Sequence, residues 1–483
     1  MLFNSFTYTA FLPAVCILHW ALPHRYRWML LLAASYYFYM NWNPVYAVLI
    51  LVTTAVSYLA AVFMETAGER TKKIILFIAS AVCFGILFVF KYFNFVMDAV
   101  CGGLRLFSVN ASPPVLDLLL PVGISFYTFQ TAGYIIDVYR GGVKAERHFG
   151  YYALFVSFFP QLVAGPVERA ENLLPQLKSA KNFDESRFIS GLKAMLWGYY
   201  KKLVVADTLA VYVNQVYGSL EDYEGPALAA AAFFFSLQVY CDFSGYSDIA
   251  IGTAELFGIR FLDNFAAPYF AVSVQEFWKR WHISLSSWFR DYVYIPLGGS
   301  RCTVAVRCRN LLVTFLASGI WHGAGWTFMA WGALHGLAQA AEVLMRGPLE
   351  KLRRLKAGRF VLRAAVFGFC TAAWVFFRAD SLGDAWYVLS HMSDGIASPV
   401  SYIRSGCISL GIDKFRLVYL AALIFILMAA DYGLYRNKGH KTGRMEALMK
   451  NRAAEWALYV MLGVLIVLFS QKGEAAEFIY FQF

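Results

Sequence analysis

Long stretches without Asp, Glu, Lys or Arg recur along this 483-residue chain and constrain its fold more than any other feature. Hydrophobic residues make up 59% of the chain and charged residues only 15%, unlike the composition of soluble globular domains. A helix that crosses a membrane needs about 20 mostly apolar residues, and these stretches supply them. We therefore expect an all-α polytopic membrane protein with a bundle of about 10–12 transmembrane helices.

The limits of the expected spans follow from length. Residues 28–64 are uncharged and would be about 55 Å long as one helix, so we expect a break at Asn41-Trp42-Asn43-Pro44. The first apolar stretch lacks a preceding basic region and a clear cleavage site, which predicts a retained span. No repeat or separate soluble domain is visible, and we expect residues 1–483 to form one integral-membrane domain. Further candidate spans are residues 74–90, 118–136, about 191–217, 226–257, 311–341, 364–377, 417–430 and 456–471.

The net charge of +11 comes from short basic clusters between apolar stretches, a pattern typical of cytoplasmic loops rather than nucleic-acid binding. With these clusters in the cytoplasm, we expect both termini and the acidic connection 221–224 on the other side. Basic clusters flank both ends of residues 149–167 and 311–341, which predicts re-entrant segments. The eight cysteines are scattered and form no disulfide framework or zinc motif, so we expect no bound metal.

His322 is an ionisable residue in an apolar stretch, residues 311–341, that has no charged side chain. Polar groups at membrane depth usually face a cavity, a pathway or a reaction centre. A buried neutral imidazole can act as general base when an alcohol attacks an acyl group. A histidine that packs between helices and bonds a carbonyl explains the position equally well. Gly319, Gly323 and Gly325 predict a helix break beside His322.

Residues 276–299 differ from the rest because aromatic residues recur there at helical spacing among basic ones. The spacing predicts an amphipathic helix that lies in the membrane interface. Its expected aromatic face consists of Trp278, Trp281, Leu285, Trp288 and Tyr292. His282 borders this face, and its position leaves a hydrogen-bonded structural role and a catalytic role equally open.

Two other polar segments are candidates for the site. Residues 238–248 place Asp242 and Ser244 at the end of an apolar stretch. Intramembrane carboxylates can relay protons, but they also cap or bridge helices, and we favour structural support of the site. Gln161 lies between Pro160 and Gly165-Pro166, in a segment that could line a route for a substrate or form a simple re-entrant turn.

Five segments together resemble the membrane-bound O-acyltransferase (MBOAT) family, and specifically its AlgI-like bacterial branch, which O-acetylates alginate and other exopolysaccharides. They are residues 158–166, 240–248, 276–286, 294–299 and 319–323, the last reading Gly-Ile-Trp-His-Gly. The resemblance implies a helical bundle around a central funnel, with a catalytic core at about residues 118–345. It also implies that His322 is the intramembrane catalytic histidine and His282 the second one. The expected substrate-binding residues are Trp321, Trp278, Trp281, Gln161, Asp242 and Ser244.

The aromatic tail, residues 473–483, carries a second resemblance. Its last six residues, Phe-Ile-Tyr-Phe-Gln-Phe, are similar to the Phe-x-Tyr-x-x-Phe motif of a small membrane peptide. That peptide works with the D-alanyl-transferring branch in teichoic acid modification, where its tyrosine is regarded as the acyl carrier. The resemblance implies that Tyr480 is a catalytic acyl relay. An aromatic tail is also typical of a membrane-interface anchor.

The resemblance implies an acetyltransferase of the bacterial inner membrane that uses cytoplasmic acetyl-CoA as donor, without a bound cofactor. Its product is an O-acetylated extracytoplasmic polysaccharide. The expected partners are this polysaccharide, a periplasmic SGNH-hydrolase-like acetyltransferase and membrane lipid, with no nucleic acid. His322 is the expected general base, and the acceptor is Tyr480 or a serine of the partner. D-alanyl transfer from a carrier protein and membrane transport are the alternatives, although transport leaves the Trp-rich segment unexplained.

Overall fold

The computed structural model describes residues 1–109, 112–163, 165–436, 452–469 and 478–479, and all regular secondary structure in them is helical. Six of the described helices are long and apolar enough to cross a membrane: Pro44–Thr66, Glu69–Leu106, Pro226–Leu256, Val304–His322, Lys356–Arg378 and Lys414–Arg436. Two shorter apolar helices are Phe6–Ala21 and Glu455–Phe469. The expected all-α polytopic membrane fold is confirmed.

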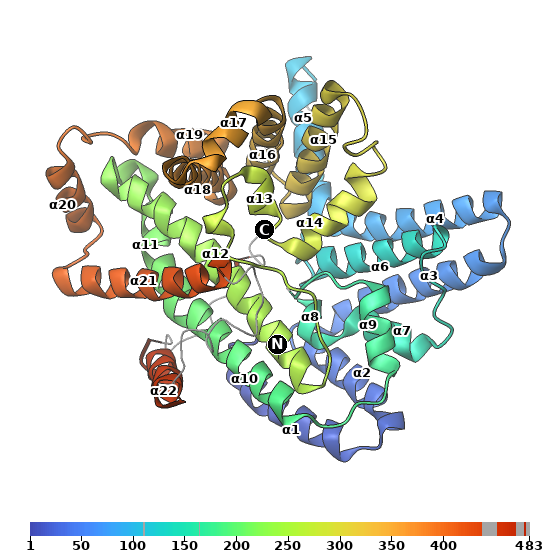
Figure 1. Cartoon of the computed structure of the whole chain (residues 1–483). Helices are drawn as coiled ribbons and strands as arrows, with labels where there is room; N and C mark the ends of the chain where they lie inside the picture. The colour runs from blue at the N-terminus through green and yellow to red at the C-terminus, as the bar shows by residue number, and fades with distance from the viewer. Residues whose placement is uncertain (110–111, 164, 437–451, 470–477, 480–483) are drawn as a thin grey trace. The chain divides into compact units, whose positions relative to one another are not determined.

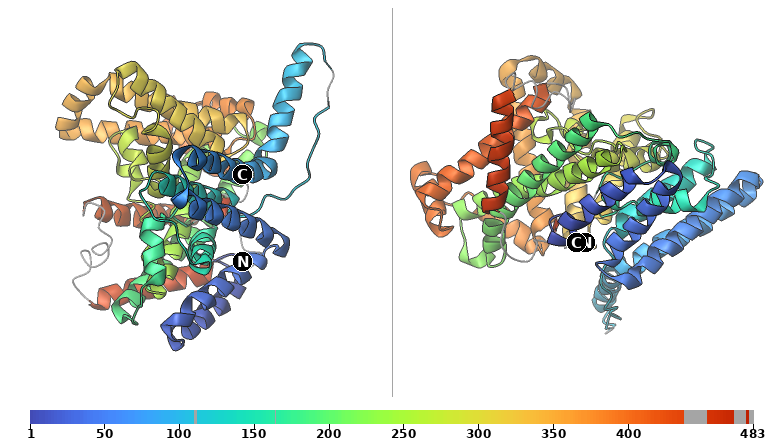
Figure 2. Two further views of the ribbon diagram at one scale, coloured as in Figure 1. Left: turned by 90° about the vertical axis from the view of Figure 1, so that its right-hand side faces the viewer. Right: turned by 90° about the horizontal axis from the view of Figure 1, so that it is seen from below.

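Contacts divide the chain into two compact units, and the first comprises Met1–Met195 and Ser247–Leu262. Within it, α3, α4 and α6 run side by side (Figures 1 and 2). The hydroxyls of Tyr8 and Thr253 lie 2.8 Å apart and join the two parts of this unit. Its helices are α1 (Phe6–Ala21), α2 (His24–Met40), η1 (Pro44–Tyr46), α3 (Ala47–Thr66), α4 (Glu69–Leu87), η2 (Phe88–Tyr92), α5 (Phe93–Leu106), α6 (Ile124–Tyr139), α7 (Phe149–Ser157), α8 (Phe159–Leu162), α9 (Ala170–Lys178) and most of α10 (Glu185–Tyr199).

The predicted break in the first long apolar stretch is confirmed. Helix α2 ends at Met40, and α3 begins at Ala47 after the short η1 turn. The side chain of Asn43 accepts a hydrogen bond from the backbone N–H of Val45, 3.0 Å away. Pro44 needs no hydrogen bond for its nitrogen at the start of the turn. These two residues therefore end one span and start the next.

The second unit comprises Leu196–Tyr246 and Asp263–Phe483. Helices α15 and α16 form a close hairpin, and α18 packs against α16 (Figure 1). The elements that begin in this unit are η3 (Tyr200–Ala206), α11 (Asp207–Tyr217), η4 (Leu220–Asp222), α12 (Pro226–Leu256), η5 (Pro268–Phe270), α13 (Val274–Trp278), α14 (Ile283–Phe289), η6 (Arg290–Tyr294), α15 (Val304–His322), α16 (Trp326–Leu344), α17 (Arg346–Arg354), α18 (Lys356–Arg378), α19 (Leu382–His391), α20 (Pro399–Ser409), α21 (Lys414–Arg436) and α22 (Arg452–Phe469).

The prediction of one interfacial helix through residues 276–292 is wrong. Helix α13 ends at Trp278, and α14 begins at Ile283, because His282 adopts a left-handed backbone conformation with φ of 44°. The aromatic side chains do not form an exposed face either. Trp278 is 7% exposed and Trp281 is fully buried, and both contact other aromatic rings of the second unit. The helical spacing of these aromatic residues therefore reflects burial within the protein and not an exposed face.

Candidate active site

The α15–α16 hairpin positions His322, which is the last residue of α15. Gly323 follows in an extended conformation, and α16 begins at Trp326, so the predicted break beside His322 is confirmed. Gly319 lies inside α15, where an added Cβ would be 2.4 Å from the carbonyl oxygen of Phe328 on α16. Small residues of this kind let helix backbones approach closely in membrane proteins. The close approach fixes the end of α15 and thus the main chain of His322.

The imidazole of His322 is enclosed by aromatic side chains and only 2% of the residue is exposed. Its ring centroid lies 4.9 Å from that of Trp321, 4.9 Å from that of Trp331 and 5.5 Å from that of Phe377. The rings of Trp331 and Phe377 meet the imidazole edge to face. An aromatic enclosure of this kind excludes water from the imidazole.

His282 is fully buried in the loop between α13 and α14, and its tautomer can be assigned from its partner. The Nδ1 atom lies 3.1 Å from Oδ1 of Asn264. This Oδ1 also accepts the backbone N–H of Ser284, so it is an acceptor and Nδ1 carries the proton. Nε2 is then the basic nitrogen of the ring. Burial lowers the pKa of His282 to about 3, which keeps the ring neutral at physiological pH.

The structure brings the two predicted catalytic histidines together. Their ring centroids lie 6.5 Å apart, and the ring of Trp321 lies 6.0 Å from that of His282. Trp281 belongs to the same aromatic cluster through Trp374, 4.9 Å away between ring centroids. Residues 40 positions apart in sequence thus form one buried site.

The other predicted site residues are distributed differently. Asp242 and Ser244 lie on α12 and contact the buried Lys202 and Lys201, respectively. Gln161 belongs to the first unit, where its side-chain amide donates a hydrogen bond to the carbonyl of Phe155, 2.7 Å away. Tyr480 lies outside the described residues.

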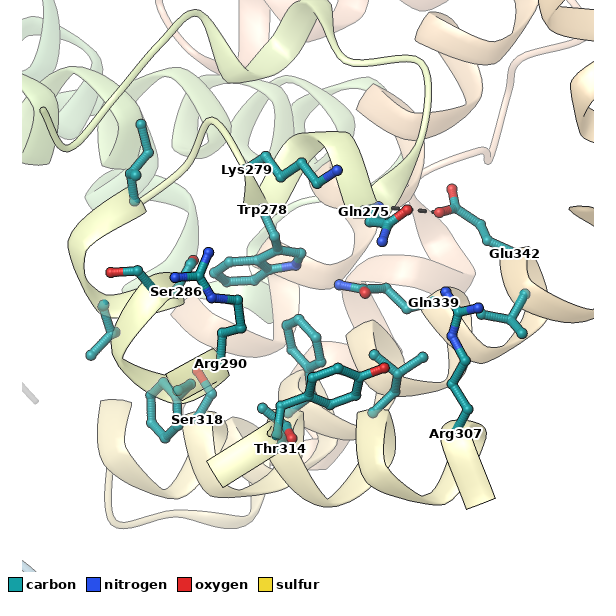
Figure 3. A pocket seen from close by; sticks show the side chains of 18 of the residues that line it. Gln275, Trp278, Lys279, Ser286, Arg290, Arg307, Thr314, Ser318, Gln339 and Glu342 are labelled. Atoms are coloured by element: carbon teal, nitrogen blue, oxygen red, sulfur yellow. Dashed lines mark hydrogen bonds between the residues drawn. The ribbon is translucent and has the colours of Figure 1, made fainter. Parts of the chain in front are cut away.

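A cavity of about 590 Å³ opens beside this site and is lined by α13, α14, η6, α15, α16 and α17. Figure 3 shows Trp278 among the side chains that converge on it, with Arg290, Arg307 and Gln339 around it. Trp278 connects the cavity to the histidine site, because its ring lies 5.7 Å from Trp331, which itself contacts His322. Ser318, another lining residue, precedes His322 by one turn of α15.

The cavity wall is strongly cationic, with Lys279, Arg290, Arg307, Arg346 and Arg353 among its lining residues. Arg290 pairs with Asp291 and Arg346 with Glu350. The carboxylate of Glu342 accepts the backbone N–H groups of Val274 and Gln275 at the start of α13. The buried Nε atoms of Arg307 and Arg353 have no hydrogen-bond partner among the residues that the structure describes. Both guanidinium groups line the cavity, and groups of this kind bind anions such as phosphate.

Three residues of the site were missed by the sequence analysis. Asn264 fixes the tautomer of His282 from 18 positions away, and no sequence spacing signals that pair. His335, on α16, accepts the indole N–H of Trp278 at Nδ1, 3.2 Å away. Trp331 is fully buried beside His322, and its indole N–H makes no hydrogen bond within the described part of the chain. Only the aromatic content of residues 326–335 hinted at such a cluster.

The helices of the described residues have the length and composition of an integral-membrane protein, and the two buried imidazoles beside a cation-lined cavity form a candidate site for acid–base chemistry. Residues 145–378 match the family model described as MBOAT, membrane-bound O-acyltransferase family. The chain is 40% identical to "Probable alginate O-acetylase AlgI" of Azotobacter vinelandii, over 81% of this chain and 78% of that protein.

Two further relatives extend this similarity. A protein of the same name from Pseudomonas putida is 36% identical over 100% of both chains. "Peptidoglycan O-acetyltransferase" of Helicobacter pylori is 34% identical over 76% of this chain and 73% of that protein. The chain therefore belongs to the membrane-bound O-acyltransferase family, as its motifs predicted. It is a multi-pass membrane enzyme that transfers acyl groups to oxygen.

Proposed function

We propose that this enzyme transfers an acetyl group from cytoplasmic acetyl-CoA across the bacterial inner membrane for O-acetylation of an extracytoplasmic polysaccharide. The observation that carries the proposal is the buried pair of His282 and His322, with ring centroids 6.5 Å apart. Acetyl transfer is the activity in the names of the O-acetylase and O-acetyltransferase relatives. A neutral imidazole shielded from water is suited to take a proton from a hydroxyl.

His322 is the general base in this proposal. It takes the proton of the acceptor hydroxyl while the oxygen attacks the carbonyl carbon of the thioester. The C–S bond then breaks, and the leaving thiolate takes the proton back from the imidazolium, so that neutral His322 and free CoA thiol result. His282 acts as the second catalytic histidine, and Asn264 holds its Nε2 as the basic nitrogen.

The cationic cavity supports acetyl-CoA as donor. CoA carries several phosphate groups, and guanidinium groups bind phosphate by charge-assisted hydrogen bonds. In this proposal the guanidinium groups of Arg307 and Arg353, which line the cavity, bind a phosphate group of the donor. Trp278 and Ser318, which also line the cavity, belong to the elements that hold His322. The donor thioester would thus approach the histidines from this cavity.

The acyl acceptor is a hydroxyl on the opposite side of the site, either Tyr480 of the chain itself or a serine of a periplasmic SGNH-hydrolase-like partner. A phenyl ester is more activated than an alkyl ester, so an acyl group on Tyr480 could pass onward to the polysaccharide. The described residues Phe478 and Ile479 are buried in the second unit, the unit that contains both histidines. This placement supports Tyr480 as the first acceptor.

Replacement of His322 tests the proposed function. In His322→Ala we expect polysaccharide acetylation to fall by about 100- to 10,000-fold, the usual contribution of a general base. Membrane abundance should remain that of the wild type. His391→Ala, a half-buried histidine on α19, is the matched control and should keep wild-type activity. Substantial acetylation by His322→Ala would contradict the proposed base.

The choice of donor needs a separate measurement. Purified enzyme offered acetyl-CoA should release CoA, whereas D-alanyl transfer would require a D-alanyl carrier protein. Solute flux without CoA release would favour membrane transport. Loss of CoA release in His322→Ala would show that the donor reacts at the histidine site.

A further inference from the structure

A buried ion cluster lies in the second unit between η3, α11 and α12. The Nζ atom of Lys202 lies 2.6 Å from Oδ1 of Asp242 and 2.9 Å from Oδ1 of Asp207. These residues are 4%, 2% and 7% exposed, respectively. Buried charges are costly unless they are paired, so the two carboxylates and the ammonium group stabilise one another. Lys202 lies on a π-helical turn, a distortion that is frequent at functional sites.

The second carboxylate oxygen of Asp242 binds the aromatic tail. Oδ2 accepts the backbone N–H of Ile479, 2.9 Å away. The preceding residue, Phe478, is 1% exposed, and its ring centroid lies 4.8 Å from that of Tyr246 and 5.6 Å from that of Phe243. Among the residues that the structure describes, Phe478 and Ile479 are therefore attached to α12 by a charge-assisted hydrogen bond and by aromatic contacts.

The attachment point lies next to the histidine site. Phe243 contacts the ring of His282 edge to face, with centroids 4.6 Å apart, on one side and Phe478 on the other. One aromatic ring thus separates the attached tail from His282.

We propose that Asp242, paired with Lys202, is a positioning residue that binds the main-chain N–H of Ile479 and so anchors the chain's own tail. The ring of Phe478 packs against α12 beside this hydrogen bond. This inference rests on the proposed acyl transfer with Tyr480 as first acceptor. Its function is to hold the main chain next to Tyr480 in register with the histidine site. Asp242 then binds the acceptor arm of the enzyme itself and not the polysaccharide. Because a backbone N–H is recognised, the side chain at position 479 matters less than its amide.

Ile479→Pro is the direct test, because proline removes the N–H and leaves the buried ion cluster intact. Ile479→Val keeps the N–H and is the matched comparison. A benzophenone amino acid in place of Phe478 reports attachment by a photocrosslink to the α12 peptide that contains Phe243 and Tyr246. We expect the crosslink with Ile479→Val and its loss with Ile479→Pro. We also expect the kcat for acetylation in Ile479→Pro to be about tenfold below that in Ile479→Val, with the KM for donor unchanged.

Two outcomes would overturn the proposal: the absence of the α12 crosslink in the wild-type sequence, or equal kcat values for the proline and valine variants. Replacement of Asp242 gives an independent check. Asp242→Asn, which keeps a carbonyl acceptor for the amide, should retain more crosslink than Asp242→Ala. Crosslinking does not require acyl transfer, so a wrong assignment of His322 would be seen in His322→Ala without altering the attachment result.

Discussion

Asn264 sets the chemical state of His282 at the scale of single residues. Its Oδ1 accepts from Nδ1 of His282, from the backbone N–H of Ser284 and from the hydroxyl of Ser284. A neutral amide can orient the imidazole without adding a charge that would favour protonation. A carboxylate at the same place would orient the ring and also stabilise the imidazolium.

This difference predicts a pH effect of Asn264→Asp. The pKa of His282 is about 3, so the wild-type ring becomes protonated only as the pH falls toward that value. An adjacent carboxylate should raise this pKa by about one to three units. We expect the acid limb of the kcat profile in Asn264→Asp to move to higher pH, measured between pH 4.5 and 8.

Asn264→Ala is the companion variant for this experiment. It removes the acceptor without adding a charge, and we expect a fall in kcat of about fivefold, since a hydrogen bond contributes about 1 kcal/mol. An unchanged pH profile in Asn264→Asp would show that His282 does not titrate with the reaction.

Sequence alone could identify His322, because an ionisable residue in an uncharged stretch stands out without any knowledge of the fold. The roles of Asn264 and Trp331 could not be predicted. An asparagine in a polar loop and a tryptophan in an apolar helix are both ordinary, and their functions depend on contacts that only folding creates. Asp242 was identified as a polar site residue, but its contact with the backbone of Ile479 has no sequence pattern.

At the scale of elements, glycines allow close packing in the α15–α16 hairpin, in which α15 ends at His322. A Cβ on Gly332 of α16 would lie 2.4 Å from the carbonyl oxygen of Phe315 and 3.2 Å from the Cα of Gly319, both on α15. Backbone atoms cannot move aside as a flexible side chain can. A methyl group added at position 332 must therefore push α15 and α16 apart.

We expect Gly332→Ala to destabilise the protein by about 1–3 kcal/mol, as overpacking of a well-packed core does. Acyl transfer should fall as well, because the end of α15 moves. Gly368→Ala in α18 is the matched control, since its added Cβ has no neighbour within 4 Å in the described part of the chain beyond the backbone of its own helix. Thermal denaturation of each variant in detergent gives the midpoint of unfolding that is compared. Equal midpoints for the two variants would argue against a glycine-dependent hairpin.

Element boundaries were predictable where a residue has a fixed conformational requirement. Asn43 and Pro44 ended the first long stretch as predicted, and Gly323 separates α15 from α16. The segment around His282 was not predictable in the same way. Periodic tryptophans are expected both at a membrane interface and in a buried cluster, and the left-handed backbone of His282 gives no signal in sequence.

At the scale of the whole molecule, charged residues are few, and their concentration around one cavity makes that cavity a candidate site for a polar substrate. Only 15% of residues are charged, yet five cationic side chains line one cavity of about 590 Å³. A phosphate-bearing donor would explain this concentration. The KM for acetyl-CoA should then increase with ionic strength, because salt screens the attraction.

Arg353→Gln should raise the KM for acetyl-CoA about tenfold, corresponding to the loss of one hydrogen bond to a charged group, with little change in kcat. Arg354→Gln is the matched control, because Arg354 is exposed on the same helix and does not line the cavity. Steady-state kinetics of CoA release provide both constants. Similar KM values for the two variants would place the donor elsewhere.

Composition and length predicted the helical membrane fold, because an apolar stretch of about 20 residues satisfies its own backbone hydrogen bonds in lipid when it forms a helix. The assignment of loops to membrane faces and the single-domain organisation stay predictions. The cavity could not be predicted, because its lining comes from six elements between residues 275 and 353. No sequence pattern specifies how such segments face one another.

The lysines at positions 201 and 202 also have a consequence for biosynthesis. Each is nearly buried, and Lys202 is neutralised by Asp242, which lies in the middle of the apolar helix α12. A lysine costs about 2.5–3.5 kcal/mol at the centre of an inserted helix. The segment that carries the two lysines is synthesised before α12, so Lys202 leaves the translocon with Asp207 of its own segment but without Asp242. We expect Asp207 to reduce the cost of inserting Lys202 until α12 emerges and Asp242 completes the buried ion cluster.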